Sequence, residues 1–424
     1  MSIRTQVQSV LTHRMLLTAL AIGLVASPLL AGHAGFRSGA VGGVSIDANG
    51  VLAQPNPEGA KMLLQQLRQD VKKPAGDLAR PVELRMISLK GLEAALVHAT
   101  QNNLGHIPDE VRYLAGLQRI QYVFVYPEEN DIVIAGPGEG WKVRDDAVVV
   151  GMTTDRPVIQ LDDLLVAFRT AKKAAETPIS CSIDPTSEGR KNLDAAIAEA
   201  RRRRLTFNPA IPEMYAKALG PQQITLTGVP ADSHLARVLV AADYRMKRIA
   251  MHLDPSPVKE LPSFLQMQQQ KKSISDNMMP RWWLACNYEP VAKSEDGLAW
   301  ELRGAGVKCM TEDDFVEGGK VVGAGKVNPV AKQWADKMTE LYGELSKKDS
   351  VFGELCNVMD LCIIGALIEK EDLLAKANLQ IPMIMSGDSE VRHEAWHAPK
   401  TVATQASFLK VGRNTSSPPV AASK

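Results

Sequence analysis

The spacing of apolar residues predicts three amphipathic helices in the first half of the chain. Residues that recur at i, i+3, i+4 and i+7 lie on one face of an α-helix. The first stripe consists of Leu161, Leu164, Leu165 and Phe168. The second consists of Leu193, Ile197 and Ala200, and the third of Leu235, Val238, Leu239, Ala242, Met246 and Ile249. Asp184-Pro185 is expected to cap the second helix.

Runs of β-type residues predict two strands and two β-hairpins. The strands are expected near 178–183 and 222–229, directly before the second and third helices. The first hairpin joins two apolar runs across the loop 127–131, and the second turns at Asp296-Gly297. This combination predicts a mixed α/β (α+β) fold with helices on at least one side of a sheet.

The distribution of polar residues and prolines predicts two domains. Residues 254–280 are polar and interrupted by prolines, so we expect them to be a linker. The segment 81–253 is then a mixed α/β domain, and 281–397 is a β-hairpin plus a pair of helices. One helix of the pair carries Val330, Trp334, Leu341 and Leu345. The other, at 352–368, is interrupted by Asn357 and Asp360, is too short to cross a bilayer, and should be a buried core helix.

Two further segments flank these domains. Residues 35–80 contain many glycines and prolines in their first half, and we expect a flexible lead-in with one short strand near 43–47. Residues 398–424 carry prolines and serines but no acidic residue. We expect this tail to be mostly disordered, and removable beyond Gly412 without loss of stability.

The N-terminus has the pattern of a secretory signal peptide. Basic residues precede an uncharged apolar run at 15–30, and the small residues Gly32 and Ala34 fit a cleavage site. The pattern predicts a signal peptide at 1–34 and export to the periplasm, the cell envelope or the medium. Retention of the segment as a membrane anchor is left open, whereas no transmembrane helix is expected after cleavage.

The exported chain is expected to be almost neutral. The whole sequence has 49 Lys and Arg against 48 Asp and Glu, a net charge of +1. Cleavage would remove Arg4 and Arg14 but no acidic residue, which changes the net charge to −1. Because such a chain has no strong global field, nucleic acid is not an expected partner.

The five cysteines do not look like a disulfide scaffold. Cys356 and Cys362 share one predicted helix and are too far apart along it to form a bridge. Cys181 is interpreted as a small buried strand residue rather than a nucleophile. Cys286 and Cys309 lie on neighbouring predicted strands, and the sequence leaves open whether they pair.

Residues 393–397 have the spacing of a helix-borne zinc site, His-Glu-x-x-His. In a helix, His393 and His397 would share a zinc ion, and Glu394 would activate the metal-bound water. However, Pro399 disfavours a helix that continues past His397, and no Asp, Glu or His follows to supply a third ligand. We therefore expect no cofactor, with zinc as the alternative.

The third predicted helix offers a candidate binding surface. With its apolar stripe facing the core, Arg237, Tyr244 and Arg248 are predicted to lie together on the opposite, solvated side. Paired guanidinium donors and an aromatic ring could receive a carboxylate, a phosphate or a sugar acid. The alternative is an ordinary solvated face, and either interpretation predicts that replacing both arginines by alanine costs little stability.

Long stretches of the chain resemble a family of exported planctomycete-type proteins labelled domain of unknown function 1598. Two of them are "RPVIQLDDLLVAFRTA" and "VFGELCNVMDLCIIGALIEKE", and the others lie at 112–143, 224–251, 279–290 and 296–315. The resemblance covers Gly42 to Gly412 and implies a shared fold and an envelope or secreted location, but it brings no catalytic residues. The family pattern has no zinc motif near His393, and it continues into a further segment where this chain ends in "NTSSPPVAASK", so the last structural element of the family is expected to be missing.

Together these patterns favour an exported, envelope-associated protein with a binding or structural role and an unknown biochemical function. Its expected partner is an envelope component, with an anionic one as a candidate. The sequence holds no complete catalytic set, so a non-catalytic role is favoured and enzymatic activity is left open. The alternative is a zinc-dependent hydrolase that uses His393, Glu394 and His397.

Overall fold

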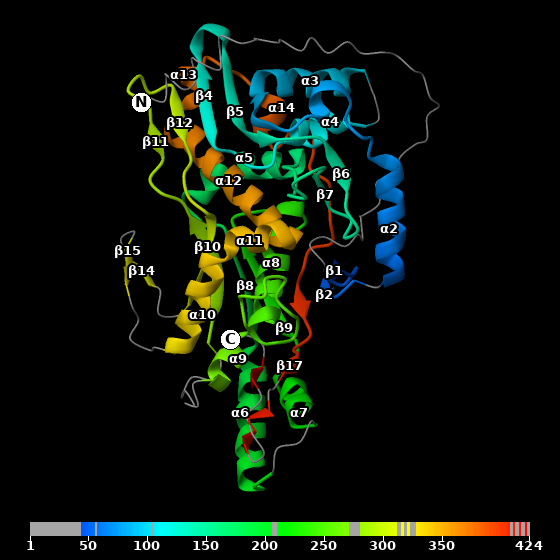
Figure 1. Ribbon diagram of the computed structural model, residues 1–424, viewed down its shortest axis with the longest axis vertical. Coiled ribbons are helices and arrows are strands. Elements are labelled where there is room, and N and C mark those ends of the chain that lie inside the picture. Colours follow the sequence, from blue (N-terminus) through cyan, green and yellow to red (C-terminus); the bar gives the residue numbers. More distant parts are fainter. Residues whose placement is uncertain are drawn as a thin grey trace.

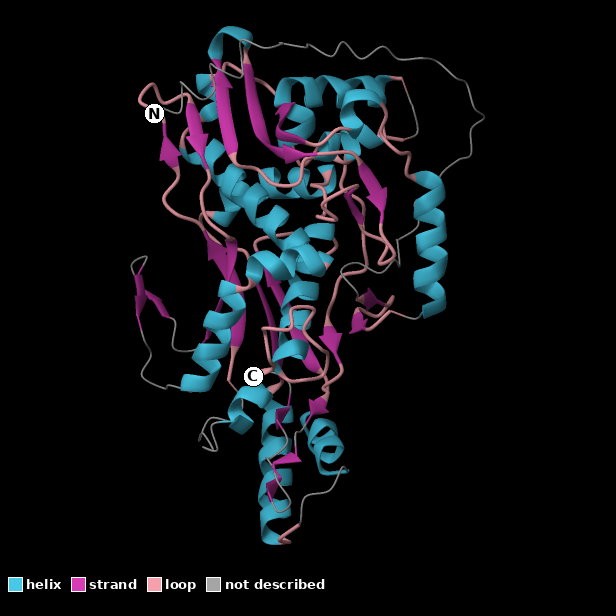
Figure 2. Ribbon diagram, in the orientation of Figure 1, coloured by secondary structure: helices cyan, strands magenta, loops and turns pink. Residues whose placement is uncertain are grey.

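The computed structural model describes residues 44–424 except 56, 103–105, 206–209, 271–279, 312–314, 318–319, 323–327, 408–409, 412–414, 417–419 and 422–424. The expected signal peptide, 1–34, lies outside the described residues. Within them, the mixed α/β (α+β) fold class is confirmed, since helices pack with two five-stranded sheets and several two-stranded ones (Figure 2).

The longer helices are α2 (Pro57–Asp70), α3 (Leu89–Gln101), α5 (Leu161–Ala174), α6 (Ser187–Arg202), α7 (Ala210–Leu219), α8 (His234–Ala250), α9 (Phe264–Gln270), α10 (Pro329–Glu340), α11 (Tyr342–Lys348) and α12 (Ser350–Lys370). Three single-turn helices are α4 (Asp109–Arg112), α13 (Leu373–Lys376) and α14 (Pro382–Met385). The strands are β1 (Ser45–Ile46), β2 (Val51–Ala53), β3 (Val82–Ser88), β4 (Tyr122–Tyr126), β5 (Asp131–Gly138), β6 (Trp141–Val143), β7 (Val149–Gly151), β8 (Ser180–Pro185), β9 (Gln222–Thr227), β10 (Trp282–Asn287), β11 (Ala292–Lys293), β12 (Ala299–Glu301), β13 (Gly306–Thr311), β14 (Phe315–Glu317), β15 (Lys320–Val322), β16 (Thr401–Val402), β17 (Ala406–Ser407), β18 (Lys410–Val411), β19 (Thr415–Ser416) and β20 (Val420–Ala421).

The first predicted hairpin lies within an antiparallel sheet with the strand order β11-β12-β4-β5-β3. β4 and β5 pair from Tyr122 opposite Ala135 to Tyr126 opposite Asp131, so this hairpin is confirmed. Side chains alternate between the two faces of a strand. The residues on the core face are Val123, Val125, Ile132 and Ile134.

A second sheet, with the order β1-β2-β16-β9-β8, joins the two ends of the described chain. In it, Thr401 of β16 lies opposite Val51 of β2 in a parallel pair and opposite Gln223 of β9 in an antiparallel pair. β16 is thus an inner strand, so the tail predicted to be mostly disordered begins with an ordered segment. Parts of the remaining tail, such as 412–414 and 422–424, lie outside the described residues.

The expected lead-in, 35–80, is also ordered over much of its length. The short strand predicted near 43–47 is confirmed as β1, and Val44, Ile46 and Leu52 are buried in the main core. The sequence patterns do not predict α2, which begins at Pro57, because the glycines and prolines before it dominate the composition. None of its residues is buried, so α2 lies against the body with few contacts.

The three helices predicted from apolar stripes are confirmed as α5, α6 and α8. The cap of α6 is not Asp184-Pro185, which ends β8, but Thr186, whose hydroxyl accepts from the N–H of Gly189. Figure 1 shows α6 and α7 extending away from the rest of the molecule, and they share a small core of their own. The helix predicted to carry Val330 to Leu345 is interrupted at Leu341, so that α10 and α11 replace it.

The predicted core helix is confirmed as α12, which crosses the middle of the molecule and packs against α5, α8 and α11 (Figure 1). It is longer than expected, and among the described helices it is the one that passes a length and composition test for crossing a membrane. However, 78% of its most apolar window is buried inside the protein. Gly365 permits close packing on α5, because a Cβ atom there would lie 3.1 Å from the carbonyl oxygen of Ala167.

The two polar residues that interrupt this helix attach it to its surroundings. Asp360 is fully buried and accepts hydrogen bonds from Arg119 Nε (2.6 Å), Arg119 Nη2 (2.9 Å), the N–H of Ile120 (3.0 Å) and the Tyr288 hydroxyl (2.6 Å). Asn357 donates to the carbonyl oxygen of Pro157 (3.0 Å). These bonds connect α12 to segments of both predicted domains.

The structure has one main core where the sequence predicts two domains. β12 pairs with β4, so strands from both sides of the expected linker share a sheet. The described part of that linker, 254–270, places Val258, Leu261 and Phe264 in the same core as α8 and α12. Residues 271–279 of the linker lie outside the described residues. The described part of the expected linker thus belongs to the core, and its apolar side chains are spaced too irregularly among polar residues to be recognised as core.

The Asp360 network predicts a large stability loss when its charge is removed. We expect Asp360→Asn to lower the free energy of unfolding by about 3 kcal/mol, since Arg119 would then be left half-buried without its carboxylate. Glu369→Gln, at an exposed position of the same helix, is the matched control and should change stability by less than about 0.5 kcal/mol. Urea unfolding of both variants measures the difference, and equal midpoints would contradict this account of the helix.

Candidate ligand-binding site

Three helices begin around one cavity between α2 and the body of the protein. α5 begins at Leu161, α8 at His234, and α12 at Ser350. The cavity has a volume of about 130 Å³. Its charged lining residues are Arg112, Asp162, His234, Glu354, Arg392 and Glu394. Its aliphatic lining residues include Leu63 and Leu67 of α2, Ile107, Val148, Val149 and Leu161.

His234 is buried between two carboxylates. Its Nδ1 lies 3.0 Å from both carboxylate oxygens of Asp163, and its Nε2 lies 3.8 Å from Glu354 Oε1. Burial alone would lower the pKa of His234, but Asp163, Glu354 and Asp162 together raise it to about 9. The imidazole is therefore protonated at neutral pH, and it donates to Asp163. Ser233 fixes the start of α8 at this point by accepting from the N–H of Ala236.

Glu354 combines deep burial with an unsatisfied oxygen. Its side chain is 5% exposed, and its Oε2 has no hydrogen-bond partner among the described residues. Burial raises the pKa of Glu354 to about 7, and His234 only partly opposes this effect. A buried carboxyl oxygen without a donor costs free energy, so such a group in a cavity marks a place where a ligand can supply the missing bond.

Asp162 and Glu394 form a second acidic pair at the cavity. The backbone N–H of Glu394 donates to Asp162 Oδ2 (3.2 Å). Burial and the nearby charges of Glu394 and Asp163 raise the pKa of Asp162 to about 6. Arg112 faces both acids and interacts with them electrostatically, so it balances part of their charge.

The segment 391–398 covers this cluster, and other elements hold its backbone in place. Arg169 donates to the carbonyl oxygens of Met383 (2.6 Å) and Val391 (2.9 Å). The N–H of Trp396 donates to the carbonyl oxygen of Asp232 (2.7 Å). The guanidinium carbon of Arg237 lies 4.6 Å from the centroid of the Trp396 indole ring. The ring of His234 lies beside the same indole.

The structure does not place the His-Glu-x-x-His residues in a helix. Residues 391–400 form no helical turn, so His393 and His397 lack the i, i+4 geometry on which the zinc alternative depends. His393 Nε2 instead lies 3.7 Å from Asp232 Oδ1. Within the described ranges, no group of three or more His, Cys, Asp or Glu side chains is arranged to hold a metal ion. Glu394, by contrast, does line the cavity.

The predicted binding surface on α8 is not a solvated face. Arg237 is fully buried, and Arg248 is nearly so, because α8 is covered on both sides. Arg248 forms hydrogen bonds to both carboxylate oxygens of Asp254, and it donates to the Tyr244 hydroxyl. The structure thus brings Tyr244 and Arg248 together but places Arg237 elsewhere, beside Trp396. Replacing both arginines should destabilise the fold by several kcal/mol, in contrast to the prediction from sequence.

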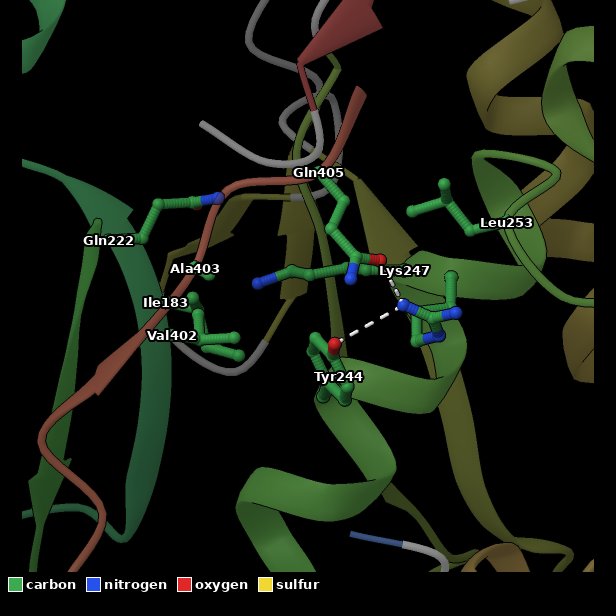
Figure 3. A pocket seen from close by; sticks show the side chains of 9 residues that line it. Ile183, Gln222, Tyr244, Lys247, Leu253, Val402, Ala403 and Gln405 are labelled. Atoms are coloured by element: carbon green, nitrogen blue, oxygen red, sulfur yellow. Dashed lines mark hydrogen bonds between the residues drawn. The ribbon is translucent and has the colours of Figure 1, made fainter. Parts of the chain in front are cut away.

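The cavity beside Tyr244 is too small to replace that surface as a binding site. Figure 3 shows Tyr244, Lys247, Val402 and Gln405 around it, and its volume of about 20 Å³ holds roughly one water molecule. Arg248 also donates to Gln405 there, which ties α8 to the chain after β16. This cavity is a packing feature where α8 meets the second sheet.

The five cysteines are present as thiols. Cys286 lies opposite Val307, and Cys309 opposite Leu284, so the two cysteines occupy diagonal positions on paired strands. The Sγ atom of Cys286 contacts Met359, and that of Cys309 contacts Met246. Both thiols are therefore directed at methionines of the core helices.

Sequence reasoning missed most of this site. Asp162, His234 and Glu354 belong to helices that were predicted, but their charges were assigned to no site, and only Glu394 was named. One signal was available, namely Glu354 inside a strongly apolar helix, since a charged residue there requires a partner or a function.

The buried acids and His234 predict that the protein loses stability as the pH rises. In the unfolded chain the acids have pKa values of about 4 and histidine has a pKa of about 6.5. These values are lower than those in the folded state. The folded state therefore binds more protons, and the free energy of unfolding falls with pH. The contribution of Asp162 and Glu354 falls between about pH 4 and 7, and that of His234 between about pH 6.5 and 9.

Urea unfolding from pH 6.5 to 9 tests the His234 part of this dependence. The parent protein should lose up to about 1.4 kcal/mol per pH unit in this range. His234→Gln should have a flatter profile, and the exposed His98→Gln should keep the parent slope. The same slope in all three proteins would show that His234 is not protonated in the folded state.

Comparison with known proteins assigns a label to one part of the chain. Residues 181–264 match the profile of a family described as a protein of unknown function (DUF1598). The matched region runs from β8 to the start of α9 and contains His234, but not the other charged residues that line the cavity. No curated protein and no solved structure matches the chain. The resemblance to domain of unknown function 1598 is thus confirmed over residues 181–264.

Proposed function

We propose that the protein is exported and acts in the cell envelope, or after secretion, as a binding protein. Its ligand would occupy the cavity between α2 and the segment 391–398. The export part of the proposal rests on the signal-peptide pattern at 1–34. The binding part rests on the cavity.

The observation that carries the binding proposal is the state of Glu354. Other buried acids of this protein have their donors: Asp360 accepts four hydrogen bonds, and Asp163 accepts from His234. Glu354 Oε2 accepts none, and Glu354 lines a cavity with a volume of about 130 Å³. A ligand that donates to this oxygen would supply the hydrogen bond that the described residues do not provide.

The remaining lining offers polar and aromatic groups to a ligand. The groups present supply hydrogen-bond acceptors, two arginines, and the aromatic rings of Tyr113 and Trp396. The segment with His393 and His397 has no helical turn, so it does not support the hydrolase alternative.

Export predicts a shortened N-terminus in the native protein. Mass spectrometry of protein from its own cells should find the first residue between Gly32 and Val41, because signal peptidase cuts after small residues. Recovery of intact Met1 in a membrane fraction would instead identify an anchored protein, and intact Met1 in the cytosol would exclude export.

Ligand binding predicts that filling the cavity abolishes thermal stabilisation by small molecules. A panel of small amines, carboxylates, alcohols and sugars should contain at least one class that raises the melting temperature, because a ligand of the folded state stabilises it. Leu67→Trp places a larger side chain against the cavity and should remove this increase. Met62→Trp, at an exposed position of α2, is the matched control and should retain it.

The absence of any stabilising class in this panel would contradict the binding proposal. Stabilisation that is equal in the parent, Leu67→Trp and Met62→Trp would place the ligand elsewhere on the protein. Both outcomes can be distinguished from misfolding, since the melting temperature of each ligand-free variant is measured in the same experiment.

A further inference from the structure

We propose that the cavity binds a small organic cation, whose ammonium or guanidinium group donates to Glu354 and whose apolar part occupies the rest of the cavity. This inference rests on the proposed binding function and adds the chemical class of the ligand. It follows from how the charges around the cavity are paired.

Two acids near Glu354, Asp163 and Asp146, are each paired with a cation, whereas Glu354 has no close cation among the described residues. Asp163 is paired with His234 at 3.0 Å. Asp146, on the loop before β7, is paired with Arg144 at 2.6 Å. Glu354 is left with a distant contact, 3.8 Å, to the same His234 that Asp163 already binds. Glu354 therefore lacks a close counter-charge, and a ligand cation would supply one.

The two arginines that line the cavity do not supply the missing positive charge at Glu354. Arg112 faces Asp109, Asp162 and Glu394, so three acids compete for one guanidinium. Arg392 is exposed, and its charge is therefore screened by solvent. An anionic ligand would have to approach Asp162, Glu354 and Glu394 together, which like-charge repulsion opposes. The charges thus favour a cation over the anionic partner considered from the sequence.

The uncharged lining limits the rest of the ligand. Leu63, Leu67, Ile107 and Leu161 give the cavity a largely aliphatic wall. Its volume of about 130 Å³ is close to that of engineered apolar cavities that bind benzene. A fitting ligand is therefore a compact amine with a ring or a short branched chain, rather than a polyamine or a sugar.

Binding of such a cation is coupled to a proton. Near neutral pH part of the protein carries protonated Glu354, and its carboxyl proton must leave when an ammonium ion takes its place. One proton is released to solvent for each Glu354 that ionises, and the charge of the site is unchanged. Affinity should therefore rise with pH as Glu354 ionises, with His234, Asp163, Asp146 and Arg144 as the other charged groups that face it.

Titration calorimetry with three matched probes tests the ligand class on the full chain. Benzylamine is the cationic probe, benzyl alcohol the neutral one and benzoate the anionic one. We expect benzylamine to bind at least tenfold more tightly than benzyl alcohol, and benzoate to bind more weakly than both. The binding enthalpy of benzylamine at pH 6.5 should also depend on the ionisation enthalpy of the buffer, since a proton is released.

Glu354→Gln keeps the shape of the side chain and removes its charge. This variant should bind benzylamine at least tenfold more weakly, should bind benzyl alcohol as the parent does, and should lose the buffer dependence. Glu369→Gln, exposed on the same helix, should behave as the parent in all three respects. If Glu354→Gln does not fold, the parent's preference among the probes and its proton release still decide the question.

The outcomes separate the two proposals. Benzyl alcohol or benzoate could bind at least as tightly as benzylamine and lose this binding in Leu67→Trp. That result would overturn the proposal of a cationic ligand but leave the proposed binding function standing. Benzylamine binding that Glu354→Gln does not weaken would overturn the role of Glu354. If none of the probes binds and the wider panel stabilises nothing, both proposals fall together.

Discussion

The buried carboxylate of Asp360 is the interaction on which the arrangement of the core depends. Burying a carboxylate is costly unless donors satisfy it, and here Arg119, the N–H of Ile120 and the Tyr288 hydroxyl all do so. These donors belong to the connection before β4 and to the connection after β10. α12 is thereby fixed relative to strands from both halves of the chain, which explains why a helix apolar enough to cross a membrane serves as the shared core helix.

Fixing α12 also determines where Glu354 lies. The two acids are six residues apart on one helix, a rise of about 9 Å, so the network that holds Asp360 places Glu354 among the starts of α5 and α8. One carboxylate is fully satisfied and contributes to the fold, whereas the other retains an oxygen without a donor. Because the other buried acids are satisfied, the fold tolerates the free-energy cost of one carboxyl oxygen without a donor. Unsatisfied buried groups of this kind are concentrated at functional sites.

The sequence predicted the local elements well, because periodicity is a local property. The stripes of α5, α6 and α8 and the hairpin of β4 and β5 depend on neighbouring residues alone. It failed where the outcome depends on distant partners. Periodicity shows which face of α8 is apolar but not that Trp396 covers Arg237 on another face. Likewise, no local pattern shows that Thr401 pairs with Val51, so local composition predicts less order at the start of the tail and in the lead-in than the structure has there.

The site shows the same division between local and distant information. Asp162, His234, Glu354 and Glu394 are far apart in the sequence, and only the meeting of three helix starts brings them together. The His-Glu-x-x-His spacing predicts Glu394 beside a helix-borne zinc site, but the structure has no helical turn at 391–400. Glu394 lines the cavity because Arg169 and Asp232 hold the backbone on either side of it, and neither contact involves the imidazole of His393 or His397. The position of Glu394 is thus set by backbone anchoring, and the spacing of the two histidines around it carries no separate information about the site.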